Sequence, residues 1–149
     1  GTSVIPCQPN YCLPRSGIKS CSGCDFTRIK LAKKLDLLFA DIVMQAKGSR
    51  IGLVGYGNSV CANYGMNTNK TEVKQNIANF TANCGATCIS CGVKAAWLQL
   101  NSSLRNKYVL LMSDGEANTC LSGVCGPGAA YAEALDLAVD AFNESGLVF

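Results

Sequence analysis

The chain has 149 residues and a net charge of +3, and 48% of its residues are hydrophobic against 15% charged. This length suits one globular domain, and the composition excludes a disordered chain and a strongly basic nucleic-acid binder. The longest apolar-rich stretch, residues 35–46, is broken by Asp36, Asp41 and Gln45, and it is shorter than the roughly 18 residues of a membrane-spanning helix. The chain has no His, so His-based triads and His-ligated metals are excluded. The sequence therefore predicts a single soluble domain.

The cysteine count indicates the compartment. Ten Cys is an even number and high for this length, and disulfides of this density are typical of extracytoplasmic proteins. No secretory signal peptide is visible at the first residues. Four Asn-x-Ser/Thr sequons favour the same setting and are candidates for glycosylation. The sequons begin at Asn69, Asn79, Asn101 and Asn143.

Residues 1–26 differ from the rest of the chain. They contain three of the four Pro and four of the ten Cys, and no helical or strand period runs through them. We interpret them as a loop fastened by disulfides and residues 27–149 as the folded domain. The pairs Cys7–Cys12 and Cys21–Cys24 are one arrangement, although spacing alone does not fix the connectivity.

From Thr27 onward, helical and strand patterns alternate. Periods of three and four predict helices over residues 27–48, from 73 to near 83, over 93–104 and over 130–141. Apolar runs predict strands at 50–56, 59–64 and 108–112, with a last one beginning at 147. In the loop 114–128, Cys120 and Cys125 are expected to bridge each other. This alternation predicts an α/β fold with a mostly parallel sheet covered by helices on both faces.

Two groups of motifs have more than one interpretation. The glycines of residues 52–57 follow the order GxxGxG, which does not match a dinucleotide fingerprint and suits a tightly packed strand end.

The pairs Cys21–Cys24 and Cys88–Cys91 each have CxxC spacing. Such pairs build zinc sites with four thiolates or serve as redox dithiols. We favour structural disulfides, because a zinc site leaves six further Cys unexplained. The two remaining Cys, which belong to none of the pairs and loops named above, are Cys61 and Cys84.

The most informative segment is Tyr108-Val-Leu-Leu-Met-Ser-Asp-Gly-Glu-Ala117. It predicts a buried strand followed directly by a carboxylate, Asp114. In open α/β sheets, ligands bind at the carboxyl ends of parallel strands. Asp114 is therefore the first candidate for a ligand-binding residue.

Together with residues 30–34, 51–56 and Cys84-Gly-Ala-Thr87, this segment resembles the von Willebrand factor type A domain family over residues 27–149. The resemblance implies a Rossmann-like three-layer sandwich with a metal-ion-dependent adhesion site on top of the sheet. It maps two metal ligands onto Asp114 and Thr87, with Glu116 as a tuning or merely solvated residue. Magnesium, or calcium or manganese in its place, prefers such oxygen ligands, and a partner carboxylate would complete the coordination.

One part of the family pattern is missing. The motif Asp-x-Ser-x-Ser is absent, and residues 14–19 match it poorly. The resemblance implies that the first strand and first motif precede Gly1 and that residues 1–26 are an insertion. We therefore expect the 149 residues not to fold autonomously and to bind metal weakly. The rest of the chain, or another subunit, would supply the missing central strand.

These features predict an extracellular or cell-surface adhesion module that engages a protein or glycan partner. The alternative is a disulfide-hardened structural subunit of a surface layer or filament. The absence of His, of a nucleophile motif and of paired carboxylates argues against an enzyme. Among classes of enzyme, a dithiol oxidoreductase fits the sequence least badly.

Overall fold

The computed structural model describes residues 28–81, 84–113 and 115–149. The helices of this part are α1 (Arg28–Val43), α2 (Lys70–Asn79), α3 (Ile89–Leu100) and α4 (Pro127–Ser145). Its strands are β1 (Ile51–Tyr56), β2 (Val60–Asn67), β3 (Lys107–Tyr108), β4 (Thr119–Cys120), β5 (Gly123–Val124) and β6 (Leu147–Val148). None of these helices is long and apolar enough to cross a membrane.

The strands form three two-stranded sheets in the described residues. β1 and β2 pair as an antiparallel hairpin, β3 and β6 pair in parallel, and β4 and β5 form a second antiparallel hairpin. The mixture of helices and strands confirms the α/β class. Among the described residues, the single mostly parallel sheet expected from the alternation is not formed: β1 pairs with β2, and β3 pairs with β6.

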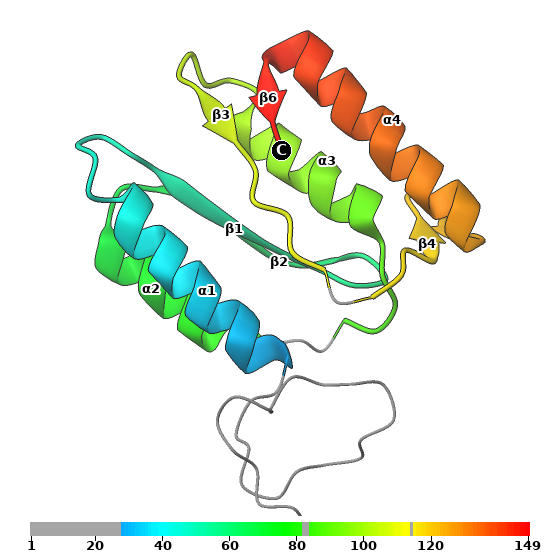
Figure 1. Ribbon diagram of the computed structural model, residues 1–149, viewed down its shortest axis with the longest axis horizontal. Helices are drawn as coiled ribbons and strands as arrows, with labels where there is room; N and C mark the ends of the chain where they lie inside the picture. Colours follow the sequence, from blue (N-terminus) through cyan, green and yellow to red (C-terminus); the bar gives the residue numbers. More distant parts are fainter. Residues whose placement is uncertain (1–27, 82–83, 114) are drawn as a thin grey trace, which may run out of the picture.

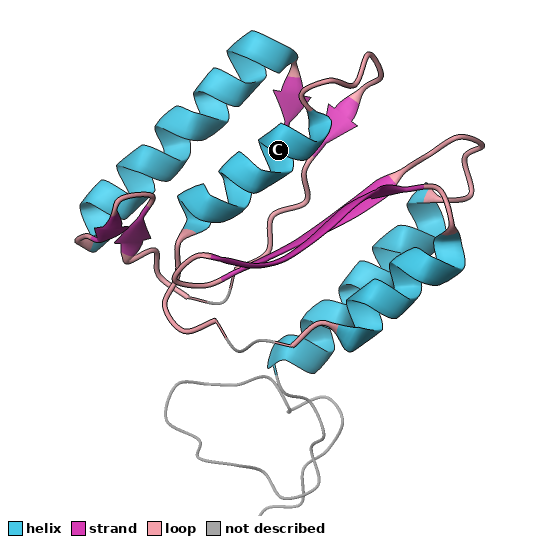
Figure 2. Ribbon diagram, turned by 180° about the vertical axis from the view of Figure 1, so that it is seen from behind, coloured by secondary structure: helices cyan, strands magenta, loops and turns pink. Residues whose placement is uncertain are grey.

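The helices lie in two pairs around the β1–β2 hairpin. Figure 1 shows α1 and α2 side by side on one side of the hairpin, with α3 and α4 together on the other; the view from behind shows the same grouping (Figure 2). Ala40, Val73 and Ile77 form the buried cluster between the first pair. The cluster at the second pair is larger and reaches the loop after β3. Its buried members are Ile89, Val93, Ala117, Cys120, Ala130 and Ala134.

Two predicted elements differ from their expected extents. Only Tyr108 of the predicted strand 108–112 lies in β3, because no second strand lies beside residues 110–112 in the described chain to pair with them. The helix predicted over 93–104 begins at Ile89 and ends at Leu100. It begins earlier because the Cys88 sulfur caps it by accepting a hydrogen bond from the Cys91 N–H. Leu104, expected on its apolar face, is fully exposed.

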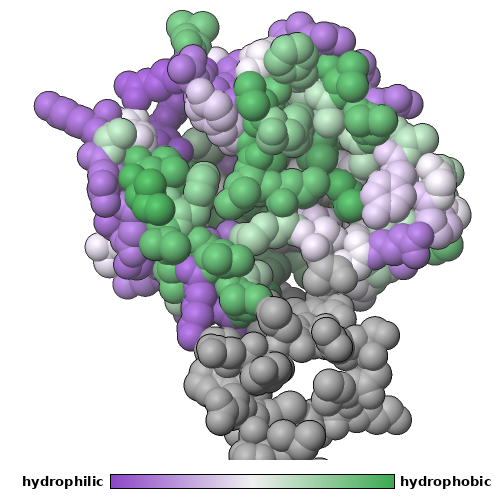
Figure 3. All heavy atoms as spheres, viewed as in Figure 1, coloured by the Kyte–Doolittle hydropathy of each residue, from purple (hydrophilic) through white to green (hydrophobic). Residues whose placement is uncertain are grey.

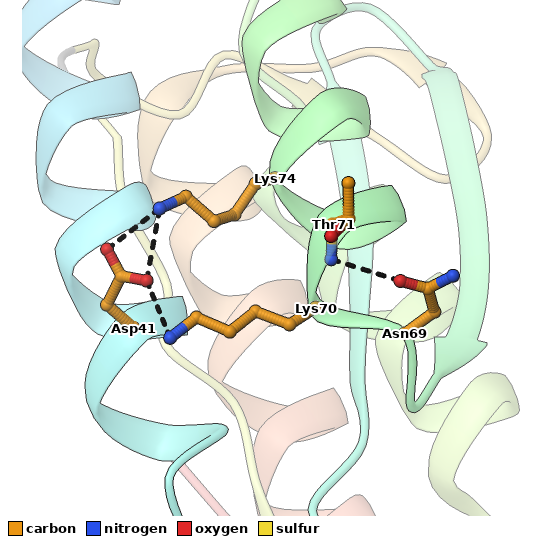
Figure 4. Close-up of polar contacts among 5 residues, drawn as sticks. All are labelled: Asp41, Asn69, Lys70, Thr71 and Lys74. Atoms are coloured by element: carbon orange, nitrogen blue, oxygen red, sulfur yellow. Dashed lines mark hydrogen bonds and ion pairs between the residues drawn. The ribbon is translucent and has the colours of Figure 1, made fainter.

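Polar contacts at α2 fix its start and its position against α1 (Figure 4). The Asn69 side chain caps the helix by accepting a hydrogen bond from the Thr71 N–H at 3.1 Å. Lys70 and Lys74 both pair with Asp41 on α1, at 2.8 and 3.0 Å. Hydrogen bonds from these ammonium groups hold the pKa of Asp41 below its usual range.

Two glycines let side chains from flanking helices lie directly against β1. A Cβ on Gly55 would overlap the Phe80 ring that follows α2, and a Cβ on Gly52 would overlap Gln99 of α3. Gly65 on β2 has open space around it instead. The glycines of residues 52–57 therefore serve close packing, as the sequence predicted.

We expect Gly55→Ala to lower the free energy of unfolding by about 1–3 kcal/mol, because the Phe80 ring has to move. The matched strand variant Gly65→Ala should change it by no more than about 0.5 kcal/mol. Urea unfolding followed by circular dichroism measures both. Equal effects of the two variants would contradict this account of β1 packing.

Candidate functional site

Three disulfides lie among the described residues. They join Cys61 to Cys84, Cys88 to Cys91 and Cys120 to Cys125. The predicted Cys120–Cys125 bridge is confirmed, and the second CxxC pair is a disulfide, as favoured over a zinc thiolate site. The remaining predicted cysteines, Cys7, Cys12, Cys21 and Cys24, lie outside the described residues.

The loop that carries Thr87 is held at both ends. Cys84 and Cys88 flank it, and each is bridged by a disulfide. The turn between β1 and β2 adds two backbone hydrogen bonds: the Asn58 N–H donates to the Cys84 carbonyl at 2.9 Å, and the Cys88 N–H donates to the Gly57 carbonyl at 2.6 Å. A Cβ on Gly57 would lie 2.4 Å from the Cys84 carbonyl oxygen, so this turn needs glycine to approach so closely.

The Thr87 loop also lies against the segment that follows the predicted strand 108–112. The Thr87 N–H donates to the Asn118 side-chain oxygen at 2.9 Å, and the Asn118 N–H donates to the Thr87 carbonyl at 3.0 Å. A Cβ on Gly115 would lie 2.7 Å from the Thr87 hydroxyl oxygen. The two loops predicted to share a metal therefore meet. Sequence reasoning did not identify Asn118, because a single Asn in a loop carries no recognisable pattern.

The described part of this site offers hydroxyl oxygens. Ser113 Oγ lies 3.1 Å from the Gly115 carbonyl and donates to it, and Thr87 is half-buried beside Gly115. Glu116 is exposed to solvent. Asp114, the predicted carboxylate ligand, lies outside the described residues, and the described residues contain no group of three His, Cys, Asp or Glu that could hold a metal ion. Hydroxyl oxygens are among the ligands that hard cations take.

A second feature is a large groove between β1 and residues 108–113. It encloses about 1590 Å³. One wall carries Ile29, Ala32, Asp36, Phe39 and Val43 of α1, and the other carries Gly92, Ala96, Gln99 and Leu100 of α3. We call this space the β1 groove. Figure 3 shows apolar side chains gathered around the middle of the corresponding face.

Asp36 is the acidic residue among the groove-lining positions of α1. The neighbouring groove-lining positions Ala32, Phe39 and Val43 are apolar, and Lys33, three residues before Asp36, donates to the Ala78 carbonyl at 2.6 Å. Burial raises the pKa of Asp36 to about 6, because the charged carboxylate loses hydration against this apolar face.

The four predicted sequon asparagines are exposed in the structure, which is the accessibility that glycosylation requires. Asn79 is the last residue of α2, Asn143 lies in α4 and Asn101 follows α3. Asn69 uses its side-chain oxygen as the cap of α2. The exposed set is Asn69, Asn79, Asn101 and Asn143.

Comparisons with family models, with curated proteins and with solved structures find no match for this chain. The structural basis for a functional proposal is therefore the contact of the Thr87 loop with Ser113, Gly115 and Asn118, together with the disulfides around this loop.

We expect Asp36→Asn to raise the free energy of unfolding at pH 7 by about 1–2 kcal/mol. This is less than the full pKa shift corresponds to, because solvent partly screens this half-buried carboxylate. With a raised pKa, the native state binds the proton more tightly than the unfolded state. The contribution of Asp36 to stability is therefore most favourable below about pH 4 and falls as the pH rises toward 6, so the gain from Asn should shrink in acid.

The control for this prediction is Asp41→Asn. The pKa of Asp41 is lowered, so its loss should destabilise the chain at neutral pH and matter less in acid, which is the opposite trend. Chemical denaturation between pH 2 and 7 measures both variants, because the Asp36 change is expected between about pH 4 and 6 and the Asp41 change below about pH 4. A stability gain from Asp36→Asn that does not change with pH would contradict the burial of this carboxylate.

Proposed function

We propose that this chain is an extracellular or cell-surface binding module of the von Willebrand factor type A kind, which engages a protein or glycan partner through a cation-dependent face. The observation that carries this proposal is the contact between the Thr87 loop and residues 113–118. These are the two loops in which the type A resemblance predicts metal ligands. The three-layer sandwich of that family is part of the same proposal.

The proposed cation would be held by the Thr87 hydroxyl, the Ser113 hydroxyl and the Asp114 carboxylate. Mg²⁺ takes oxygen ligands in octahedral geometry and keeps several waters. When bound, the cation would supply an open position for a carboxylate of the partner. Asn118 would keep the two loops together through its pair of hydrogen bonds to Thr87.

The disulfides support the extracytoplasmic part of the proposal. The three disulfides among the described residues are typical of proteins from oxidising compartments. Two of them flank the Thr87 loop, so oxidation would fix the proposed ligand in place before any partner arrives. Such preorganisation lowers the entropy cost of binding. The exposed sequon asparagines are proposed to carry glycans in the same compartment.

The cation proposal is tested with Mn²⁺, whose paramagnetism broadens nearby amide resonances in ¹⁵N spectra. We expect selective broadening at Thr87, Ser113 and Gly115, with a dissociation constant on the order of millimolar. Asp114→Ala should abolish it. Asp140→Ala, which removes an exposed carboxylate from α4, should not. Broadening that survives Asp114→Ala, or that centres on other acidic residues, would refute this face as the cation site.

A second candidate function is a structural subunit of a surface layer or filament. The observation that favours it is an apolar stripe exposed along α4, which consists of Tyr131, Leu135, Val139 and Phe142. Exposed apolar patches of this kind mark contacts between proteins.

Electron microscopy of the native material distinguishes the two functions. Ordered polymers that persist in a chelator would support the structural subunit, and their absence together with chelator-sensitive partner binding would support the binding module.

A further inference from the structure

The Cys88–Cys91 disulfide lies at the start of α3. Cys88 is the N-cap residue of this helix and is fully buried, whereas Cys91, in the first turn, is partly exposed. The Cys91 N–H donates to the Cys88 sulfur at 3.2 Å. A sulfur that accepts an N–H at a helix N-terminus is stabilised as a thiolate. Cys88 is therefore the better leaving group of the pair when the disulfide is attacked.

Ser90, between the two cysteines, connects Cys88 to a carboxylate. Ser90 is fully buried, its hydroxyl donates to Glu133 Oε1 on α4 at 2.5 Å, and its oxygen lies 3.4 Å from the Cys88 sulfur. The Leu121 N–H donates to the same carboxylate oxygen at 2.7 Å. After reduction, the Cys88 thiol can donate to the Ser90 oxygen, because the Ser90 proton already points to Glu133. The buried site thus offers a partner to both the thiolate and the thiol of Cys88.

Cys91, and not Cys88, lines an open pocket beside α3. The pocket encloses about 290 Å³, and its apolar rim includes Leu98 and Leu121, which are 68% and 41% exposed. Lys94, three residues after Cys91, lines the same pocket, and its ammonium favours the approach of a thiolate. An incoming thiolate therefore reaches Cys91 first, and exposed apolar side chains of this kind favour contact with a protein.

The thiols that reach this pocket are expected to come from another polypeptide. The chain has ten Cys, an even number. Six of them form the three described disulfides, and the four Cys of residues 1–26 are expected to pair with one another. The chain itself is then no source of free thiols.

We propose that the Cys88–Cys91 disulfide exchanges with a pair of thiols on a partner polypeptide, next to apolar side chains. The first thiolate attacks Cys91 Sγ, the bond to Cys88 breaks, and the electron pair leaves with Cys88, which takes up a proton. The second thiolate attacks the partner's sulfur in this mixed disulfide, and Cys91 leaves and takes up the other proton. Two partner thiols are thereby oxidised to a disulfide, and the Cys88–Cys91 disulfide is reduced by two electrons. This activity does not depend on the proposed cation face.

The probe is a synthetic peptide dithiol with a Leu before each Cys. It is mixed with the oxidised protein at pH 7, the reaction is stopped with an alkylating reagent, and mass spectrometry maps the alkylated cysteines. We expect Cys88 and Cys91 to be labelled at least about tenfold faster than the Cys61–Cys84 and Cys120–Cys125 pairs. In urea, where the fold is lost, this selectivity should disappear. Equal labelling of the three pairs in the native protein would overturn the proposal.

Two single variants identify the attacked sulfur. Cys88→Ser leaves the partly exposed Cys91 as a free thiol, and Cys91→Ser leaves the buried Cys88. We expect the peptide, activated as a thiopyridyl disulfide, to form a mixed disulfide with Cys88→Ser at least about tenfold faster than with Cys91→Ser. An equal or faster reaction of Cys91→Ser would contradict attack at Cys91.

Ser90→Ala tests the contact that serves the reduced state. Loss of one hydrogen bond to the Cys88 thiol should lower the equilibrium constant for reduction of this disulfide by glutathione about two- to tenfold. Ser122→Ala makes the same change at an exposed Ser between Cys120 and Cys125 and should leave that constant unchanged. Equal effects of the two variants would refute the role of Ser90.

Two further variants test the partner. Leu98→Gln at the pocket should slow exchange with the Leu peptide about three- to tenfold, whereas Leu104→Gln, which changes a fully exposed Leu, should not. Equal rates in these two variants would exclude recognition by the pocket. The variant in which all four Cys of residues 1–26 are Ser should exchange at the native rate. Loss of exchange in this variant would overturn direct attack by a separate polypeptide. The cysteines replaced are Cys7, Cys12, Cys21 and Cys24.

Discussion

The structure depends on a strand edge that has no neighbour in the described chain. β1 is held on one side by β2 and is approached closely by Phe80 and Gln99 from its flanking elements, yet its other edge faces the β1 groove. The lack of a neighbouring strand in the described chain also explains why the apolar residues 110–112, close after β3, form no strand. Backbone groups of a strand require partners, and two open edges around an apolar space together define what can fill it.

The candidate cation face follows from a different constraint, which is the fixation of a short loop. Residues 84–88 are bound by two disulfides, by two hydrogen bonds to the β1–β2 turn and by Asn118. Apart from the Cys88–Cys91 disulfide, whose two residues are three positions apart, these contacts join segments that are distant in sequence. As a result, Thr87 and Gly115 are adjacent without any helix or strand of their own. A loop fixed in this way can present a hydroxyl ligand with little loss of entropy on binding.

Local patterns predicted much of the fold. The period of three and four residues identified the four helices, and the apolar run before Tyr56 identified β1, because these signals depend on neighbouring residues. The short separation of Cys120 and Cys125 indicated their bridge. The Cys61–Cys84 pairing was not predictable, because the two residues are 23 positions apart and sequence does not fix connectivity. The clamp by Asn118 and the end of α3 at Leu100 also depend on tertiary contacts.

The open edge of β1 is the central claim, and amide hydrogen exchange of the free chain, resolved by residue, tests it most directly. Successive amides of a strand point to opposite edges. The account predicts alternating protection along residues 51–56, slow where the N–H points to β2 and fast where it points to the groove. It also predicts fast exchange at Leu110 and Leu111. Uniformly slow exchange along β1 and at these two leucines would contradict it, because the groove would then already be filled by a paired strand.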